Sequence, residues 1–283
     1  MTTLPTLAVT GVTGVLGGSV ARAHAADGVA QRLLARTPAK APRLSGSTVH
    51  PFSYSDRPAS IEALTGVETL FMVSASESAD RLDQHRTFVD AAAAAGVRHI
   101  VYTSFIAAAP DAVFTLARDH GATEEHIRAS GMAWTFLRDS FYIDFMEALV
   151  GEDGVIRGPG GGGRVAIVTR ADVARTAVAV LRDPSAHAGR TYDLTGPEAL
   201  SFAEIAATIA RVRGREVSFH DESLEEAYAS RAVYGAPDWQ VDAWVSTYTA
   251  VASGGMAAVS DAVETVTGAA PQSLEAFLAS TAR

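Results

Sequence analysis

The sequence contains no cysteine and almost no lysine. None of its 283 residues is Cys, and Lys40 is the sole lysine among 23 basic side chains. The lack of cysteine excludes disulfides, thiolate nucleophiles and cysteine-bound zinc or iron–sulfur clusters. A lone lysine excludes every mechanism that needs a catalytic lysine at another position. Any redox function must therefore come from a bound cofactor.

Long apolar runs and clusters of basic residues are also absent. No stretch of about 18 consecutive apolar residues occurs, so we expect no membrane-spanning helix. The N-terminal segment 1–10 has no basic side chain and no long apolar run, which argues against a secretory signal and predicts a cytoplasmic location. The net charge is −9, and an acidic surface repels a phosphate backbone. We therefore expect no nucleic-acid partner.

Short β-compatible runs alternate with helical patterns in the first half of the chain. This alternation predicts an α/β fold with a doubly wound parallel sheet, the Rossmann fold. We expect strands at 6–10, 31–35, 47–51, 69–73, 99–104 and 133–137. We expect helices at 14–26, at 60–64 with Ser60 as its N-cap, at 80–95 and at 115–130.

The alternation weakens after about Arg138. Capping boxes of the form S-x-x-E, Ser201 with Glu204 and Ser223 with Glu226, predict two helix starts. We further expect strands at 164–168 and 190–194 and helices at 170–181, 238–253, 257–266 and 271–279. The predicted division is a dinucleotide-binding domain of residues 1–140, to which 165–195 return, and a smaller, mainly helical substrate-binding cap of 141–164 and 196–283.

The first strand ends in a glycine-rich loop, in which Gly11, Gly14 and Gly17 form G-x-x-G-x-x-G at the start of a helix. Such glycines permit a tight turn and let the backbone approach a pyrophosphate, which the amides of the helix N-terminus then hold. The alternative is that they only cap a strand and begin a packed helix. The residues expected to bind the dinucleotide here are Gly11, Thr13, Gly14, Val15, Leu16 and Gly17.

Arg36 stands at the end of the second strand, where many NAD-binding proteins have an acid that accepts hydrogen bonds from the ribose. A guanidinium cannot accept such bonds but matches a 2′-phosphate, so the sequence predicts that NADP(H) is preferred over NAD(H). The alternative is a surface arginine beside a turn. After the third strand, we expect adenine contacts from Tyr54, Ser55 and Asp56. After the fourth strand, we expect ribose contacts from Ser74, Ala75 and Ser76.

Five segments together resemble a known family: TGVTGVLG (10–17), LLARTPAKA (33–41), AGVRHIVYTS (95–104), TFLRD (135–139) and GRTYDLTGPE (189–198). They resemble the NmrA-like branch of the atypical short-chain dehydrogenase/reductase superfamily. Within it, the chain is most similar to the type 2 NAD(P)H:quinone oxidoreductases and also looks similar to bacterial triphenylmethane reductase. The resemblance implies an NAD(P)H-dependent oxidoreductase.

Other members of the wider superfamily use a Tyr-x-x-x-Lys pair, which this chain cannot build because Lys40 lies between the second and third strands. The corresponding helix carries His120, Thr123 and Glu124, as the quinone reductases do. His120 and Glu124 are four residues apart and share a helical face. A quinone needs no strong acid, because the charge left by hydride transfer delocalises into a phenolate. We therefore expect hydride transfer from NADPH to a quinone or a similarly electron-poor small molecule.

Several residues remain open to a functional or a structural interpretation. His120 is expected to orient the acceptor or relay a proton, or only to hold the helix near the nucleotide. Thr103 and Ser104 end a strand, where we expect Thr103 to contact the cofactor and Ser104 to face the reaction. The remaining candidates are Glu124 for the cofactor and Phe105, Phe141 and Tyr142 as an apolar wall for the acceptor or as core.

Other interpretations of the sequence stay open as well. His120 and His126 lie on different helical faces, so we expect no metal site. A regulator that senses the dinucleotide without turnover is the first alternative function. A reductase of an imine, enone or lactone in secondary metabolism is the second. The sequence is compatible with a homodimer.

Overall fold

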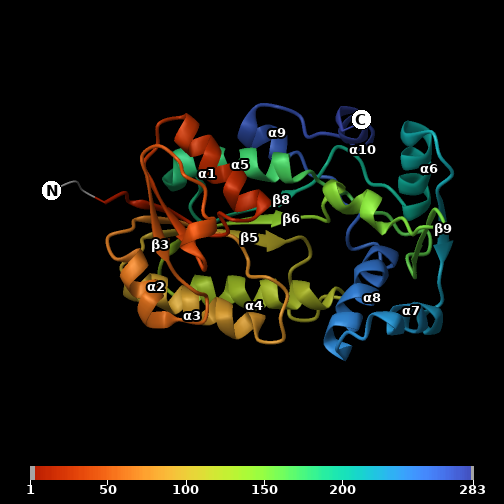
Figure 1. The fold of residues 1–283 in the computed structure, drawn as a ribbon, viewed down its shortest axis with the longest axis horizontal. Coiled ribbons are helices and arrows are strands. Elements are labelled where there is room, and N and C mark those ends of the chain that lie inside the picture. Colours follow the sequence, from red (N-terminus) through yellow and green to blue (C-terminus); the bar gives the residue numbers. More distant parts are fainter. Residues whose placement is uncertain (1–3, 282–283) are drawn as a thin grey trace. The chain divides into compact units, whose positions relative to one another are not determined.

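The computed structural model describes residues 4–281, and seven of its strands form one sheet (Figure 1). The strand order is β3-β2-β1-β4-β5-β6-β8, and β1 pairs in parallel with both β2 and β4. The order in which successive strands are added reverses at β1, as in a doubly wound fold. The predicted fold class is therefore confirmed. The strands are β1 Leu7–Val9, β2 Gln31–Ala35, β3 Ser47–Pro51, β4 Thr69–Met72, β5 His99–Phe105, β6 Ala133–Asp139 and β8 Arg190–Leu194.

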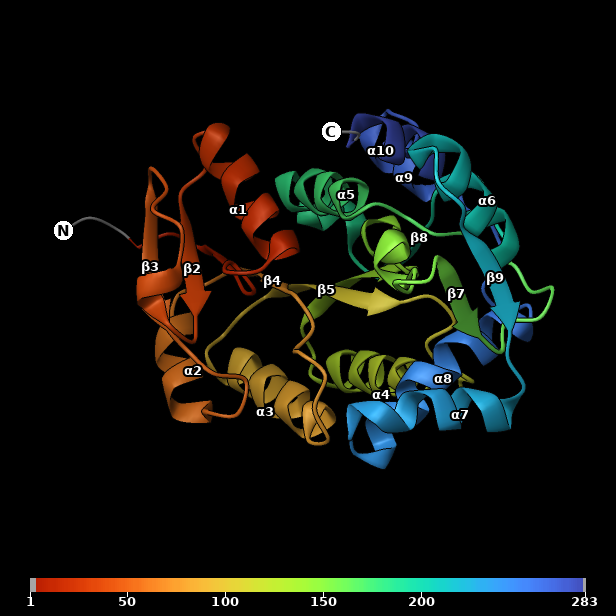
Figure 2. The same cartoon turned by 45° about the vertical axis from the view of Figure 1, so that its right-hand side comes forward.

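Helices cover both faces of this sheet, as Figures 1 and 2 show. On one face lie α1 (Val15–Ala26) and α5 (Arg170–Arg182). On the other lie α2 (Arg57–Leu64), α3 (Arg81–Ala94) and α4 (Thr115–Ala129). Strands β2 and β5 are buried along their whole length, which is what a sheet covered on both sides requires.

The chain divides into two compact units. Unit 1 consists of Met1–Ser104, Asp119–Arg138 and Val173–Tyr192, and unit 2 of Phe105–Arg118, Asp139–Asp172 and Asp193–Arg283. Each unit has its own apolar core. The core of unit 1 includes Leu64, Leu70, Phe88, Ile100 and Phe136, and that of unit 2 includes Ile156, Phe202, Ile205, Val251 and Leu274.

Unit 2 is mainly helical but also contains a small parallel sheet. Strands β7 (Val155–Gly158) and β9 (Ser218–Asp221) pair over four residues. Its main helices are α6 Phe202–Arg213, α7 Leu224–Arg231, α8 Asp238–Ala252, α9 Ala262–Thr267 and α10 Leu274–Ser280. The short 3₁₀ helices of the chain are η1 Pro38–Lys40, η2 Ile143–Leu149, η3 Pro184–His187 and η4 Ala232–Tyr234.

Most of the predicted elements are confirmed. The expected strands 31–35 and 47–51 coincide with β2 and β3 at both ends. Both capping boxes are present, with the side chain of Ser201 accepting from Glu204 N and that of Ser223 from Glu226 N. None of the helices described within residues 4–281 has the length and apolar character needed to cross a membrane.

Four local predictions are wrong. Residues 164–168 form no strand, because Val165 and Val168 each make a single bridge to a different segment and no continuous ladder results. Ser60 is not an N-cap: α2 begins earlier, where the Asp56 carboxylate accepts from Ala59 N at 3.0 Å and Pro58 suits the first turn. Helix α9 begins at residue 262 rather than 257. Helix α10 begins at residue 274 rather than 271, because the Ser273 side chain caps it by accepting from Ala276 N.

Candidate functional site

The glycine loop lies in unit 1, between the end of β1 and the start of α1. Gly11 has φ +64°, and a Cβ there would lie 3.0 Å from Val73 Cβ. A Cβ on Gly17 would lie only 2.3 Å from Thr10 O, so only glycine lets α1 pack this closely against β1. The first and third glycines of the motif are therefore required by the turn and by the packing of the helix.

The amino end of α1 is open. Gly14 is its N-cap and offers no side chain, and the first turn holds no acid. Thr13, Gly14 and Val15 are exposed, whereas Leu16 and Gly17 are buried. Backbone amides at such a helix end carry partial positive charge and suit an anion such as a pyrophosphate.

Arg36 follows β2 directly and is exposed. Its guanidinium makes no hydrogen bond or ion pair with any residue that the structure describes within 4–281. Because β2 is the neighbour of β1 and runs parallel to it, Arg36 and the glycine loop stand at the same edge of the sheet. A guanidinium without a protein partner at this edge can take a 2′-phosphate.

The segment after β3 contributes mostly to the structure of unit 1. The buried Tyr54 hydroxyl donates to Val73 O and also contacts Thr10 Oγ1, and burial raises the pKa of this phenol. Asp56 caps α2, as described above. Ser55 is exposed, and its hydroxyl is hydrogen-bonded to that of Ser53 at 3.0 Å. An adenine contact from these residues stays a prediction.

The backbone of the segment after β4, residues 74–76, is hydrogen-bonded by side chains from other parts of unit 1. Ser74 N donates to Thr103 Oγ1 at 2.8 Å, and Ala75 N donates to His85 Nε2 at 2.8 Å. Arg81 Nε donates to Ala75 O at 3.0 Å. Ser76 is exposed. The structure thus brings Thr103 together with the Ser74–Ser76 segment.

Ser104 and Glu124 are joined by a hydrogen bond. The Ser104 hydroxyl donates to Glu124 Oε1 at 2.6 Å, and both side chains are buried. Arg138 donates to the two carboxylate oxygens at 2.7 and 2.6 Å, and Arg128 donates to Oε2 at 3.0 Å. These four bonds occupy the acceptor positions of a carboxylate. A cofactor contact by Glu124 would have to replace one of them.

His120 is buried, with both ring nitrogens engaged. Arg81 Nη2 lies 2.9 Å from Nε2, and because a guanidinium can only donate, Nε2 is the acceptor. The neutral ring then carries its proton on Nδ1 and donates to the Tyr102 hydroxyl at 2.9 Å. Burial, and then the charge of Arg81, hold the pKa of His120 well below its usual value. This histidine is therefore neutral and directed into unit 1.

The predicted apolar wall lies in unit 2. The Phe105 and Phe141 rings are 5.1 Å apart, and both contact Phe114, which the sequence did not single out. The Tyr142 hydroxyl donates to Asp139 Oδ2, and burial together with this carboxylate raises the pKa of Tyr142. The Arg170 guanidinium lies over the Tyr142 ring at 4.9 Å. Tyr142 is thus a weak acid, and a role in binding the acceptor stays a prediction.

Sequence reasoning missed Arg81 and His85, which hold the segment after β4. Both are buried in α3, together with Phe88 and Ala92. The spacing 81, 85, 88 and 92 places them on one helical face. Polar side chains on an otherwise apolar face were the available signal, since a buried polar group needs a hydrogen-bond partner.

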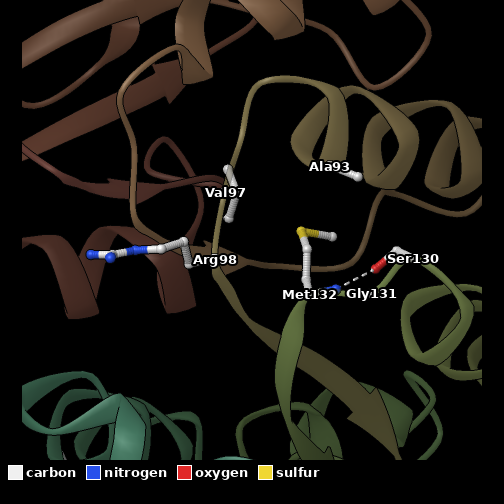
Figure 3. A pocket seen from close by; sticks show the side chains of 6 residues that line it. All are labelled: Ala93, Val97, Arg98, Ser130, Gly131 and Met132. Atoms are coloured by element: carbon white, nitrogen blue, oxygen red, sulfur yellow. Dashed lines mark hydrogen bonds between the residues drawn. The ribbon is translucent and has the colours of Figure 1, made fainter.

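A cavity of about 430 Å³ lies elsewhere in unit 1 (Figure 3). Its walls come from the segments that precede β5 and β6, at the amino edge of the sheet and opposite the carboxyl edge with the glycine loop. The Arg98 side chain points away from Met132 and pairs with Glu68 at 2.6 Å. The cavity is lined by Ala93, Val97, Arg98, Ser130, Gly131 and Met132.

Residues 4–281 contain no cluster of three or more His, Cys, Asp or Glu side chains that could hold a metal ion.

Known proteins resemble the chain over almost its whole length. Quinone oxidoreductase 2 of Escherichia coli (strain K12) is 35% identical over 257 residues, which cover 88% of this chain and 89% of that protein. The crystal structure of the NADPH-dependent quinone oxidoreductase QOR2 of E. coli, complexed with NADPH, has a TM-score of 0.88 at 32% identity. It covers 97% of this chain and 99% of its own.

A second solved structure is that of triphenylmethane reductase of Citrobacter sp., complexed with NADP(H). Its TM-score is 0.85 at 31% identity, and it covers 98% of this chain and 100% of its own. The NmrA-like family matches residues 4–251. The resemblance found in the sequence is confirmed, and the chain belongs to the NmrA-like family.

Proposed function

We propose that the protein is an NADPH-dependent reductase of quinones or similarly electron-poor small molecules. The observation that carries this proposal is the open amino end of α1 at the same edge of the sheet as Arg36, a guanidinium with no partner among residues 4–281. Relatives named as a quinone oxidoreductase and a triphenylmethane reductase, with NADPH or NADP(H) bound, support it.

The two units receive different roles in this proposal. Unit 1 binds the dinucleotide, with the α1 amides on the pyrophosphate and Arg36 on the 2′-phosphate. Unit 2 supplies the apolar surface for the acceptor from Phe105, Phe141 and Tyr142. Bound NADPH supplies a hydride.

The residues of the chain favour acceptors that need no strong acid. We infer that no Tyr-x-x-x-Lys pair serves the reaction, because Lys40 is the sole lysine and residue 36, four positions before it, is Arg. Lys40 itself lies in η1 and is exposed. The Ser104 proton is directed to Glu124, and His120 is neutral with its proton directed to Tyr102. We infer that these groups orient the site and that the reduced acceptor takes its proton from water.

The test is NADPH oxidation with a panel of benzoquinones, naphthoquinones, cationic triphenylmethane dyes, simple ketones, imines, enones and lactones. We expect turnover of the quinones and dyes and none of the ketones. Tight NADPH binding without turnover of any acceptor would contradict the enzyme and favour the dinucleotide sensor. Turnover confined to imines, enones or lactones would instead favour the reductase of secondary metabolism.

The preference for NADP(H) has its own test in Arg36→Glu. A carboxylate repels the 2′-phosphate and accepts from ribose hydroxyls, so we expect the ratio of NADPH to NADH affinity to fall by a factor of about 100. Arg43→Glu is the matched control, because Arg43 is also exposed and makes no hydrogen bond or ion pair with the described part of the chain. An unchanged ratio in Arg36→Glu refutes the role of this residue.

A further inference from the structure

The backbone of Val73, Ser74 and Ala75 makes almost all of its hydrogen bonds with side chains. Val73 N donates to Thr10 Oγ1 at 2.8 Å, and Val73 O accepts from the Tyr54 hydroxyl. Ser74 N, Ala75 N and Ala75 O are bound by side chains too, as described above. The five side chains come from four parts of unit 1, since Arg81 and His85 both belong to α3. The other three are Thr10, Tyr54 and Thr103.

Among these five side chains, His85 is an imidazole whose tautomer is fixed by its hydrogen bonds. A backbone N–H can only donate, so Nε2 accepts from Ala75 and the ring proton sits on Nδ1. Nδ1 lies 2.9 Å from Thr123 Oγ1, which itself donates to Asp119 O at 2.7 Å. The hydroxyl of Thr123 is therefore the acceptor from His85. The chain of bonds runs in one direction, from Ala75 through the imidazole to α4.

The surroundings of His85 keep the ring neutral and in place. It is fully buried, and its ring makes edge contacts with those of Tyr54 and Tyr102 at 6.1 and 5.8 Å. Burial, and then the charge of Arg81, lower the pKa of His85 to about 3. The acceptor on Nε2 therefore persists throughout the neutral pH range.

The side chains of Ser74 and Ser76 take no part in the bonds that hold this backbone. The hydroxyls of Ser74 and Ser76 make no hydrogen bond to any residue described within 4–281, and Ser76 is exposed. The order β2-β1-β4-β5 puts Arg36, the glycine loop, the Ser74–Ser76 segment and Thr103 in sequence along the carboxyl edge. A dinucleotide with its 2′-phosphate at Arg36 and its pyrophosphate at the glycine loop extends its nicotinamide half toward the Ser74–Ser76 segment.

We propose that His85 is a positioning residue for the nicotinamide half of the dinucleotide. It fixes Ala75 N, while Arg81 fixes Ala75 O, so that Ser74 and Ser76 present their free polar groups in one arrangement. The inference rests on the proposed dinucleotide binding but concerns a residue that does not itself touch the ligand.

The test compares two ligands that share only one half. The proposal places adenosine 2′,5′-bisphosphate at Arg36 without a contact to the segment after β4, whereas it places NADPH at both. In His85→Phe the ring volume is kept and the acceptor is lost, so we expect the Kd for NADPH to rise about tenfold. The Kd for the bisphosphate stays within about twofold. In His85→Gln the side-chain oxygen can accept from Ala75 N, and we expect most of the NADPH affinity to return.

Two further variants keep the test decisive. His99→Phe is the matched control, because His99 is also a buried histidine bonded to a threonine hydroxyl, Thr135, but at the amino end of β5. We expect no change in NADPH binding there. Thr123→Val keeps the imidazole and removes its second partner, and we expect a rise of about threefold in the Kd for NADPH. It provides the measurement if His85→Phe does not fold.

The outcomes separate this proposal from the function. If His85→Phe binds NADPH as the parent does, or loses both ligands equally, the positioning role is overturned. If the parent binds NADPH but turns over no acceptor, the reductase fails while the binding comparison still decides on His85. If the parent binds no NADPH, both proposals fall.

Discussion

Arg138 grips Glu124 with two parallel hydrogen bonds, from Nε to Oε1 at 2.7 Å and from Nη2 to Oε2 at 2.6 Å. The carboxylate is 1% exposed and the guanidinium 22%. Such a bidentate pair fixes both side chains in one plane. Since Ser104 also donates to this carboxylate, the pair determines the direction of the Ser104 hydroxyl at the end of β5.

The first prediction concerns this carboxylate. Glu124→Gln leaves two guanidinium groups facing a neutral amide, and we expect the free energy of unfolding to fall by about 2–3 kcal/mol. The loss is smaller than for a fully buried pair because both arginines keep access to water. Urea denaturation measures it, with the exposed neighbour in Glu125→Gln as the control. Equal stability of the two variants would show that the bonds to Glu124 contribute nothing net.

The second prediction concerns the close approach of α1 to β1. In Gly17→Ala the new methyl group would overlap Thr10 O, so the helix must shift and carry the glycine loop with it. We expect a loss of about 2–3 kcal/mol in unfolding free energy and of NADPH binding. Gly162→Ala is the control, since a Cβ there meets no atom within 4 Å. NADPH binding in Gly17→Ala equal to that of the parent would refute the packing argument.

The third prediction concerns His24, a buried residue of α1. Neither of its ring nitrogens has a hydrogen-bond partner within the described part of the chain. Removing an unpaired buried polar group is favourable, so we expect His24→Leu to raise the free energy of unfolding by about 1 kcal/mol near neutral pH. His220→Leu, at an exposed position, is expected to change it by less than about 0.5 kcal/mol.

The same variant has a pH dependence of known sign. Burial lowers the pKa of His24 below its usual 6.5. Between the pKa of His24 in the unfolded chain and its lower pKa in the folded chain, the unfolded imidazole binds a proton and the folded one does not. The free energy of unfolding therefore falls as the pH drops through this range. The advantage of His24→Leu therefore grows when urea denaturation is moved from about pH 7.5 to about pH 5.5. An advantage that shrinks on acidification would mean that the folded protein accepts this proton.

The sequence was informative where structure follows from local chemistry. The β-compatible runs of β2 and β3 and the two S-x-x-E boxes predict their elements, because strand propensity and helix capping depend on residues that are neighbours in the chain. Gly17 is also local in this sense, since the spacing of the glycines already implies a helix packed closely on a strand.

The rest depends on partners that are distant in the chain. Strand β7 has four residues, and its partner β9 lies about sixty residues later, so neither carries a signal of its own. The saturation of Glu124 was equally hidden, because Arg138 belongs to β6 and Ser104 to β5. The sequence placed Glu124 on a helix face but not the four donors around it.

The way in which Val73 and Ala75 are held also determines how the segment after β4 can be engineered. Its backbone conformation depends on hydrogen bonds from five side chains located between Thr10 and Thr103, and not on its own side chains. Grafting these few residues onto another Rossmann scaffold would transfer their sequence but not their backbone conformation. The transplantable module is the segment together with its five supports.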